Sequence, residues 1–94
     1  MFASPARADD GQFLTDIKSR GVAHPGMSDS DLLVDGRQVC IEVGTVGMSP
    51  DITRTWITAE LQRAGAPPSY ADATTLVHYA LRDLCPGAVN STGI

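Results

Sequence analysis

The chain is short, moderately apolar and acidic. Its 94 residues suit a single domain, and a domain of this size buries only about 60–65% of its unfolded surface, so we expect a marginal core. The formal net charge of -4 repels phosphate backbones, which excludes nucleic acid as a partner. No apolar run approaches the roughly 20 residues that span a bilayer, and we therefore expect no transmembrane segment.

Residues 1–8 resemble the end of a secretory signal peptide. Residues 6–8 read Ala-Arg-Ala, the A-x-A pattern of a cleavage site, and two aspartates follow as the start of a mature chain. The apolar region that precedes such a site is missing, so the segment is either a signal-peptide remnant or a chance match. Two cysteines far apart in the sequence suit an oxidising compartment. Together these features predict a secreted, extracytoplasmic protein at the cell envelope.

Hydrophobic periodicity and helix-boundary residues predict four helices, at residues 10–20, 28–43, 50–64 and 70–84, the second starting at Ser28 or at Ser30. We expect the first helix to end in a Schellman motif at Gly21 and Val22. Ser49 followed by a proline is typical of a helix start, and residues 44–47, with two glycines, are expected to form a flexible connection. The expected apolar faces comprise Phe13, Leu14, Ile17, Leu32, Leu33, Val39, Cys40, Val43, Ile52, Trp56, Ile57, Ala59, Leu61, Tyr70, Ala73, Val77, Ala80, Leu81 and Leu84.

These elements predict a compact all-α domain of four helices over residues 9–86, closed by one disulfide. Residues 1–8 are expected to be a signal-peptide remnant or disordered, and residues 87–94 to be a disordered tail. Gly36 lies inside the second helix, where glycine costs about 1 kcal/mol relative to alanine. Such a cost suggests that a neighbouring helix passes too close for a side chain.

Cys40 and Cys85 are expected to form the disulfide. Their pairing closes a loop of about 46 residues, and loop-closure entropy then stabilises the fold by roughly 4 kcal/mol. The alternative is a pair of buried free thiols in a cytosolic helical protein. A catalytic redox pair is disfavoured, because redox dithiols usually occur as C-x-x-C at a helix N-terminus, where the thiolate is stabilised.

Other residue types offer little for catalysis or metal binding. His24 and His78 are the only imidazoles, and His78 falls on the polar face of its helix. Two isolated histidines and two paired cysteines do not supply the four ligands of a structural zinc site, so no metal and no cofactor are predicted. Asp29, Asp31 and Asp35 do not match the ligand spacing of an EF-hand loop, and helix capping explains the first two better.

The sequence allows two placements of Trp56, one in the core and one on the surface. The favoured interpretation places it in the core, packed on the second and fourth helices. The alternative places it partly exposed beside Ile52 and Met48, in an apolar patch for a partner protein or a lipid-like ligand, because tryptophan is enriched at interface hot spots.

Four short patterns along the chain resemble those of one family. They are Asp10-x-x-Phe13-Leu14, Gly21-Val22, Asp35-Gly36-x-x-x-Cys40 and Val77-x-x-Ala80-x-x-x-x-Cys85-Pro86. Over residues 9–86 the chain resembles the small exported actinobacterial, chiefly mycobacterial, proteins grouped as domain of unknown function 732. The resemblance implies a disulfide between the two cysteines and assigns no activity. Residues 50–64, with their tryptophan, depart most from the family pattern.

The function expected from these observations is binding rather than catalysis. The first hypothesis is a non-catalytic protein-interaction module at the cell envelope, whose partner is another protein. The second is a carrier of a small apolar or lipid-like ligand, which requires an enclosed cavity of a few hundred Å3, roughly the size of other small-molecule sites. A hydrolytic enzyme is the least favoured, because it would need one of the histidines beside a carboxylate.

Overall fold

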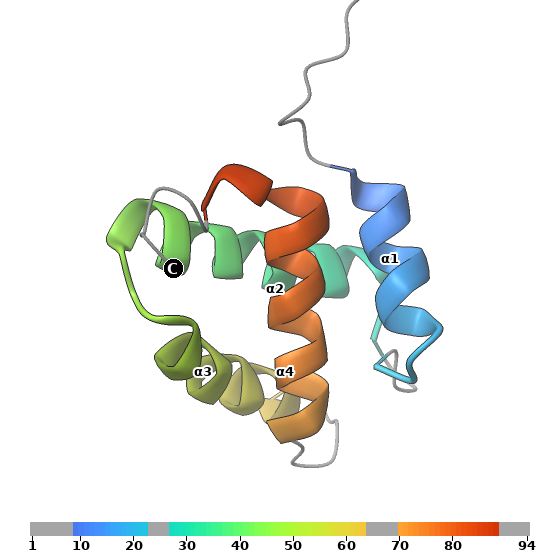
Figure 1. Ribbon diagram of the computed structural model, residues 1–94. Helices are drawn as coiled ribbons and strands as arrows, with labels where there is room; N and C mark the ends of the chain where they lie inside the picture. Colours follow the sequence, from blue (N-terminus) through green and yellow to red (C-terminus); the bar gives the residue numbers. More distant parts are fainter. Residues whose placement is uncertain (1–8, 23–26, 64–69, 89–94) are drawn as a thin grey trace, which may run out of the picture.

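The computed structural model describes residues 9–22, 27–63 and 70–88. Its elements, in chain order, are α1 (Asp10–Lys18), α2 (Asp29–Cys40), the π-helical segment η1 (Ile41–Val46), α3 (Pro50–Arg63), α4 (Tyr70–Tyr79) and the π-helical segment η2 (Ala80–Leu84). These ranges contain no strand, so the predicted all-α class is confirmed. In Figure 1, α4 crosses in front of α2, with α1 to the right and α3 to the lower left. None of the helices described is long and apolar enough to cross a membrane.

The ends of α1 follow from local side-chain and backbone chemistry. The carboxylate of Asp9 accepts a hydrogen bond from the backbone N–H of Gln12 at 3.0 Å and so caps the first turn. At the other end, Gly21 adopts a φ of 80°, and the N–H of Val22 donates to the carbonyl of Ile17 at 3.1 Å. This is the predicted Schellman motif, and it folds the fully buried Val22 back onto the core.

A capping box starts α2. The backbone N–H of Asp31 donates to Ser28 Oγ at 3.1 Å, and the backbone N–H of Ser28 donates to the Asp31 carboxylate at 2.9 Å. The two side chains together therefore satisfy two backbone N–H groups that would otherwise have no partner. Of the two predicted starts, Ser28 and Ser30, the structure has the first, with Ser28 as the N-cap.

The expected flexible connection after α2 is wrong for most of its length. The helix continues in π form through Val46, and only Gly47, with a φ of 83°, ends it. Gly44 remains in the helix. A glycine ends a helix only where it adopts the left-handed conformation, and inside a helix it costs only about 1 kcal/mol relative to alanine. The exit from this segment is closed by a hydrogen bond from the N–H of Met48 to the carbonyl of Glu42 at 2.8 Å.

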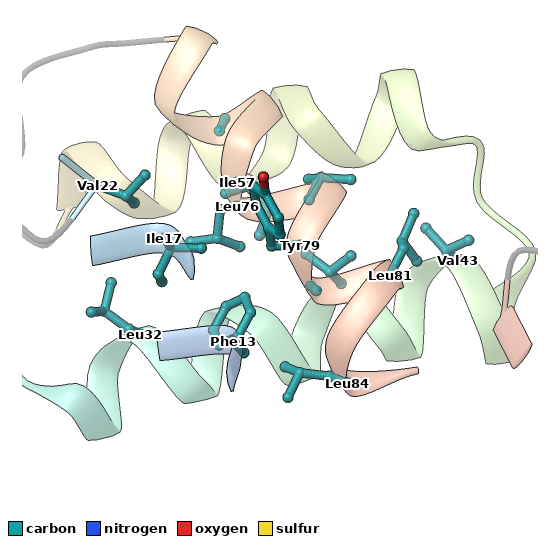
Figure 2. Packing of buried hydrophobic residues seen from close by; sticks show 14 of the residues in the cluster. Phe13, Ile17, Val22, Leu32, Val43, Ile57, Leu76, Tyr79, Leu81 and Leu84 are labelled. Carbon is teal, nitrogen blue, oxygen red and sulfur yellow. The ribbon is translucent and has the colours of Figure 1, made fainter. Parts of the chain in front are cut away.

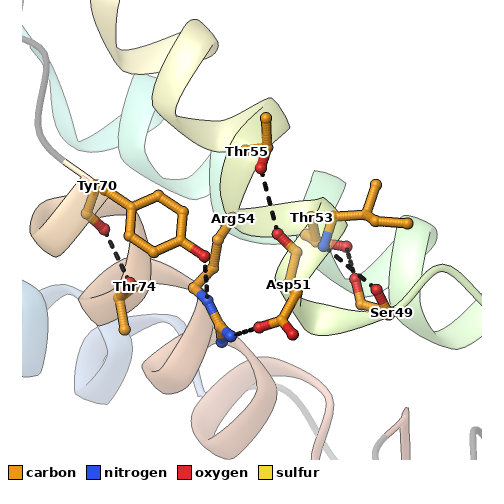
Figure 3. A network of polar contacts seen from close by, with 8 residues as sticks. Ser49, Asp51, Thr53, Arg54, Thr55, Tyr70 and Thr74 are labelled. Atoms are coloured by element: carbon orange, nitrogen blue, oxygen red, sulfur yellow. Dashed lines mark hydrogen bonds and ion pairs between the residues drawn. The ribbon is translucent and has the colours of Figure 1, made fainter.

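Ser49 starts α3, as predicted, by accepting a hydrogen bond from the N–H of Ile52 at 3.3 Å. Polar contacts then tie α3 to α4 (Figure 3). Arg54 forms an ion pair with Asp51, one turn earlier, and its Nε donates to the hydroxyl of Tyr70 at 3.2 Å. Tyr70 is half exposed at the start of α4, so it contributes to this surface network and not to the predicted core.

The buried face of α3 differs from the predicted one. Thr53, Ile57 and Leu61 are its buried residues, spaced four apart, whereas Ile52 and Trp56 point outward. Thr53 can be fully buried because its hydroxyl donates to the carbonyl of Ser49 at 3.0 Å. A satisfied threonine thus takes a core position that hydrophobicity alone assigned to larger residues.

One cluster of buried side chains, contributed by all the helices, forms the core (Figure 2). Its members are Phe13, Ile17, Val22, Leu32, Val39, Val43, Ile57, Leu61, Ala73, Leu76, Val77, Tyr79, Ala80, Leu81, Leu84 and Ala88. Leu14, Leu33 and Cys40, expected in the core, are only half-buried against it. Leu76 and Tyr79 are core residues that the sequence pattern did not indicate. Helical structure extends to Ala88, two residues past the predicted domain boundary.

Candidate functional site

The predicted disulfide joins Cys40 to Cys85, with their Cα atoms 5.9 Å apart. Cys40 is the last residue of α2, and Cys85 directly follows η2. Both are half-buried against the core cluster. The bond therefore fixes the end of α2 against the end of the α4–η2 helix, and α3 lies within the covalently closed loop.

Gly36 lies one turn before the disulfide, on the buried face of α2. A Cβ atom at this position would lie 2.7 Å from Leu84 Cδ1 and 2.7 Å from Phe13 Cζ, distances too short for real carbon contacts. The predicted close approach is confirmed, and it comes from two elements at once, α1 and η2. This contact sets how near α2 lies to its neighbours.

Trp56 is 54% exposed, so its favoured placement in the core is wrong. Ile52, one turn earlier on the same helix face, is 52% exposed, and Met48, before the helix, is half-buried. The helix turns this face outward because α3 packs on its neighbours through the Thr53 face instead. The large exposed aromatic side chain is the first feature of the surface that points to binding.

Trp56 forms part of a groove between α2 and α3. The groove has a volume of about 280 Å3 and is lined by Val34, Asp35, Gln38, Glu42, Trp56, Glu60 and Arg63. We call it the α2–α3 groove. Three of its side chains are carboxylates and one is a guanidinium, which gives it a formal charge of -2.

Asp35 is the most unusual residue of the groove. It is only 8% exposed, and within the part of the chain that the structure describes its carboxylate has no hydrogen-bond or ion-pair partner. Burial, together with the negative charges of Glu60 and Asp31, raises the pKa of Asp35 to about 6, and the guanidinium of Arg63 opposes this rise only in part. A buried carboxylate without a partner is costly, and such groups cluster at functional sites.

The other charged groups of the groove are mostly engaged with one another. Glu60 forms an ion pair with Arg63, one turn along α3. Glu42 accepts a hydrogen bond from the side-chain amide of Gln38 at 3.0 Å through Oε2, but its Oε1 is buried and has no partner among the described residues. The cation of the groove is therefore paired with Glu60, and the wall formed by α2 and η1 keeps two carboxylates with unused acceptor capacity.

Sequence reasoning tested Asp35 only as a calcium ligand and did not identify the carboxylates of this groove, although one signal was available. Asp35 lies three residues after Leu32 and four before Val39, both on the buried stripe of α2. A carboxylate on an apolar stripe is unexpected for a solvated or capping residue. Glu42 and Glu60 carried no such signal, because their approach depends on how α2 packs beside α3.

A second acidic pair lies outside the groove. Hydrogen bonding to the Asp83 carboxyl lowers the pKa of Asp16, whereas burial and the neighbouring Asp16 raise the pKa of Asp83 to about 6. Nearby, the guanidinium of Arg20 stacks 4.8 Å from the ring centroid of Tyr79. The pair links α1 to η2, and neither aspartate lines the α2–α3 groove.

The remaining candidate residues do not assemble into a site. His78 is exposed on α4, as expected, and its ring meets that of Tyr79 edge-on, while His24 lies outside the described residues. Asp31 serves in the capping box, and Asp29 pairs with Lys18 at 2.5 Å. Across residues 9–22, 27–63 and 70–88, no group of three histidine, cysteine or acidic side chains is arranged to hold a metal ion.

Comparison with known proteins supplies a family. The family model described as "Protein of unknown function (DUF732)" matches residues 8–87, which is most of the chain. The chain belongs to this family. No curated protein and no solved structure matches it. In this DUF732 member, the features that bear on function are the disulfide-held helices and the groove between α2 and α3.

Proposed function

We propose that this DUF732 member is a non-catalytic protein-interaction module, exported to the cell envelope, whose α2–α3 groove receives a positively charged segment of a partner protein. The observation that carries the proposal is Trp56, half exposed on the wall of a groove that also holds three carboxylates. Exposed tryptophan supplies large contact area at interfaces, and a groove with a formal charge of -2 favours a basic partner.

The chemistry of the groove favours a polypeptide over an apolar ligand. A carrier of lipid-like molecules needs an enclosed pocket lined mainly by aliphatic and aromatic side chains. The α2–α3 groove has only Val34 and Trp56 as apolar lining residues, beside five polar or charged ones. Burying an alkyl chain against these carboxylates would desolvate them without any compensating contact.

The same lining supports binding without catalysis. Apart from its carboxylates, the groove has no hydroxyl, thiol, imidazole or amine among its lining residues that could act as a nucleophile. His78 is not among its lining residues. The carboxylates can instead accept hydrogen bonds from a partner's cationic groups.

Export to the envelope of an actinobacterial, mycobacterial-type cell is the second part of the proposal. The disulfide between Cys40 and Cys85 supports it, because structural disulfides persist in oxidising compartments and are rare in reducing ones. The A-x-A pattern at residues 6–8 supports it independently of the cysteines.

Selection of random peptides against the oxidised protein tests the proposed function. A displayed library of 12-residue peptides would be panned, and the enriched peptides synthesised and measured by calorimetry. We expect basic peptides that bind the native chain and lose at least tenfold in affinity with Trp56→Ala, because hot-spot aromatics commonly carry more than 1.4 kcal/mol. Tyr70→Ala removes an equally exposed aromatic outside the groove and serves as the matched control.

The outcomes separate the candidate functions. Enriched peptides that bind equally well to the native chain and to Trp56→Ala would contradict the groove as the site of interaction. If no peptide is enriched while a fluorescent fatty acid binds with saturation, the carrier hypothesis replaces the proposal.

A further inference from the structure

The α2–α3 groove contains a buried carboxylate that can select one chemical group of a partner. Among the described residues, Asp35 combines nine-tenths burial with the lack of any hydrogen-bond or ion-pair partner, and it lines the groove. Two side-chain oxygens of the described residues are fully enclosed and lack a hydrogen-bond partner, namely Glu42 Oε1 and Asp83 Oδ2. The oxygens of Asp35 are not among these enclosed atoms. The Asp35 carboxylate is thus an acceptor that a group entering the groove can reach.

We propose that the groove is a binding site for the guanidinium group of an arginine side chain, with Asp35 as its hydrogen-bond acceptor and Trp56 as its stacking surface. The inference rests on the proposed function and names the partner group that the groove selects. Guanidinium donates two parallel hydrogen bonds to a carboxylate and stacks on aromatic faces, whereas the ammonium of lysine does neither as well.

The surrounding charges favour the same occupant. Arg63 is the one cation among the lining residues, and it is paired with Glu60. An arriving guanidinium therefore meets the unpaired Asp35 within the field of Glu42, whose Oε1 also lacks a partner in the described part of the chain. The same protein already shows the stacking mode elsewhere, where Arg20 lies over the ring of Tyr79.

The probe that tests the inference is N-acetyl-arginine methylamide, titrated into the oxidised, isotope-labelled protein at constant ionic strength and followed by NMR. We expect saturable shifts in the millimolar range at the amides of residues 34–42 and 56–63. The citrulline derivative, which has the same shape without the charge, should give no saturable shift. The lysine derivative should bind several-fold more weakly, and equal binding of lysine would overturn the assignment to guanidinium.

Variants assign the role of each side chain. Asp35→Asn keeps the shape and removes the charge, and it should weaken binding of the arginine probe at least tenfold. Trp56→Ala should weaken it about two- to fivefold, as expected for a partly exposed cation–π contact. Asp29→Asn removes one negative charge outside the groove and should change the affinity less than twofold. Equal losses in Asp35→Asn and Asp29→Asn would show that net charge alone attracts the probe.

Binding should also depend on pH in a way that identifies Asp35. Its carboxyl faces Asp31 on α2 and both Glu60 and Arg63 on α3, and its pKa is raised to about 6 by burial and these acidic neighbours. The ionised fraction then rises about tenfold from pH 5 to pH 7, and the affinity for the arginine probe should rise by about the same factor. Affinity that is equal at the two pH values would overturn the role of Asp35.

The failure of this inference is distinguishable from the failure of the proposed function. Selected peptides that bind through Trp56 but contain no arginine, together with no shift from the arginine probe, would refute the guanidinium site and leave the interaction module standing. Absence of both kinds of binding would refute both. A melting curve for Asp35→Asn that shows a folded protein excludes unfolding as the cause of lost binding.

Discussion

Replacing Cys40 and Cys85 together by alanine should lower the free energy of unfolding by about 4 kcal/mol. The disulfide spans a sequence separation of 45, and closing a loop of that length removes roughly 4 kcal/mol of conformational entropy from the unfolded chain. A chain of this size has a total stability of only about 5–14 kcal/mol. The bond therefore accounts for a large share of what keeps this domain folded.

The location of the bond explains why its loss affects most of the domain. It joins the end of α2 to the residue after η2, so α3, α4 and η2 lie inside the closed loop and α1 lies outside it. Without it, the ends of α2 and η2 are held by packing alone, through contacts such as those that Gly36 makes with Leu84.

Urea denaturation and thermal melting, both followed by circular dichroism, measure the effect. The oxidised native chain, the same chain with reductant, and the double alanine variant would be compared, and reductant should leave the variant unchanged. The midpoint temperature should fall by about 15–30 °C for a loss of 4 kcal/mol. The m-value should rise on reduction, because an unfolded chain without the cross-link exposes more surface. A difference of less than about 1 kcal/mol between oxidised and reduced protein would refute the reasoning.

Three further predictions concern packing, capping and pH. Gly36→Ala should destabilise the protein by about 1 kcal/mol, because overpacking against two buried side chains exceeds the helix-propensity gain. Gly11→Ala, whose new Cβ would make only an ordinary contact with Asp9 Oδ1 at 3.9 Å, should be neutral or stabilising in the same denaturation assay. Ser28→Ala should cost about 1 kcal/mol through loss of the capping box, and Ser30→Ala, at the second residue of the helix, less than about 0.5. Burial raises the pKa of Asp35 to about 6, so its contribution to the free energy of unfolding is most favourable below pH 4 and is lost as the pH rises through 6. Asp35→Asn should therefore stabilise the protein by about 1–3 kcal/mol at pH 7 and have no effect at pH 4. An equal effect at both pH values would contradict the raised pKa.

Most of the fold was predictable because its signals are local. The Schellman motif at Gly21 needs only a glycine followed by an apolar residue, and the start of α3 at Ser49 needs only a cap followed by proline. The close approach at Gly36 was also visible, since an unfavourable residue inside a helix implies a packing reason. The pairing of Cys40 with Cys85 followed from their number and separation.

The candidate site was only half predictable. Trp56 and Ile52 were identified as residues of a possible binding patch, but the stronger expectation placed Trp56 in the core. Hydrophobicity ranks tryptophan above threonine, and it does not register that Thr53 can satisfy its hydroxyl within its own helix and be buried. The outward face of α3 was therefore assigned to the interior.

The sequence by itself determined the helices apart from the continuation through Val46, and also the disulfide and the family of this protein, because each depends on residues close together or on a covalent bond. The tertiary structure decided which face of α3 is exposed and which charges meet across the α2–α3 groove. Those charges come from residues 35, 42 and 60, and their effect on one another depends on the distance between two helices. Burial makes the carboxylate of Asp35 an acceptor without a partner, and burial is a property of the packed chain.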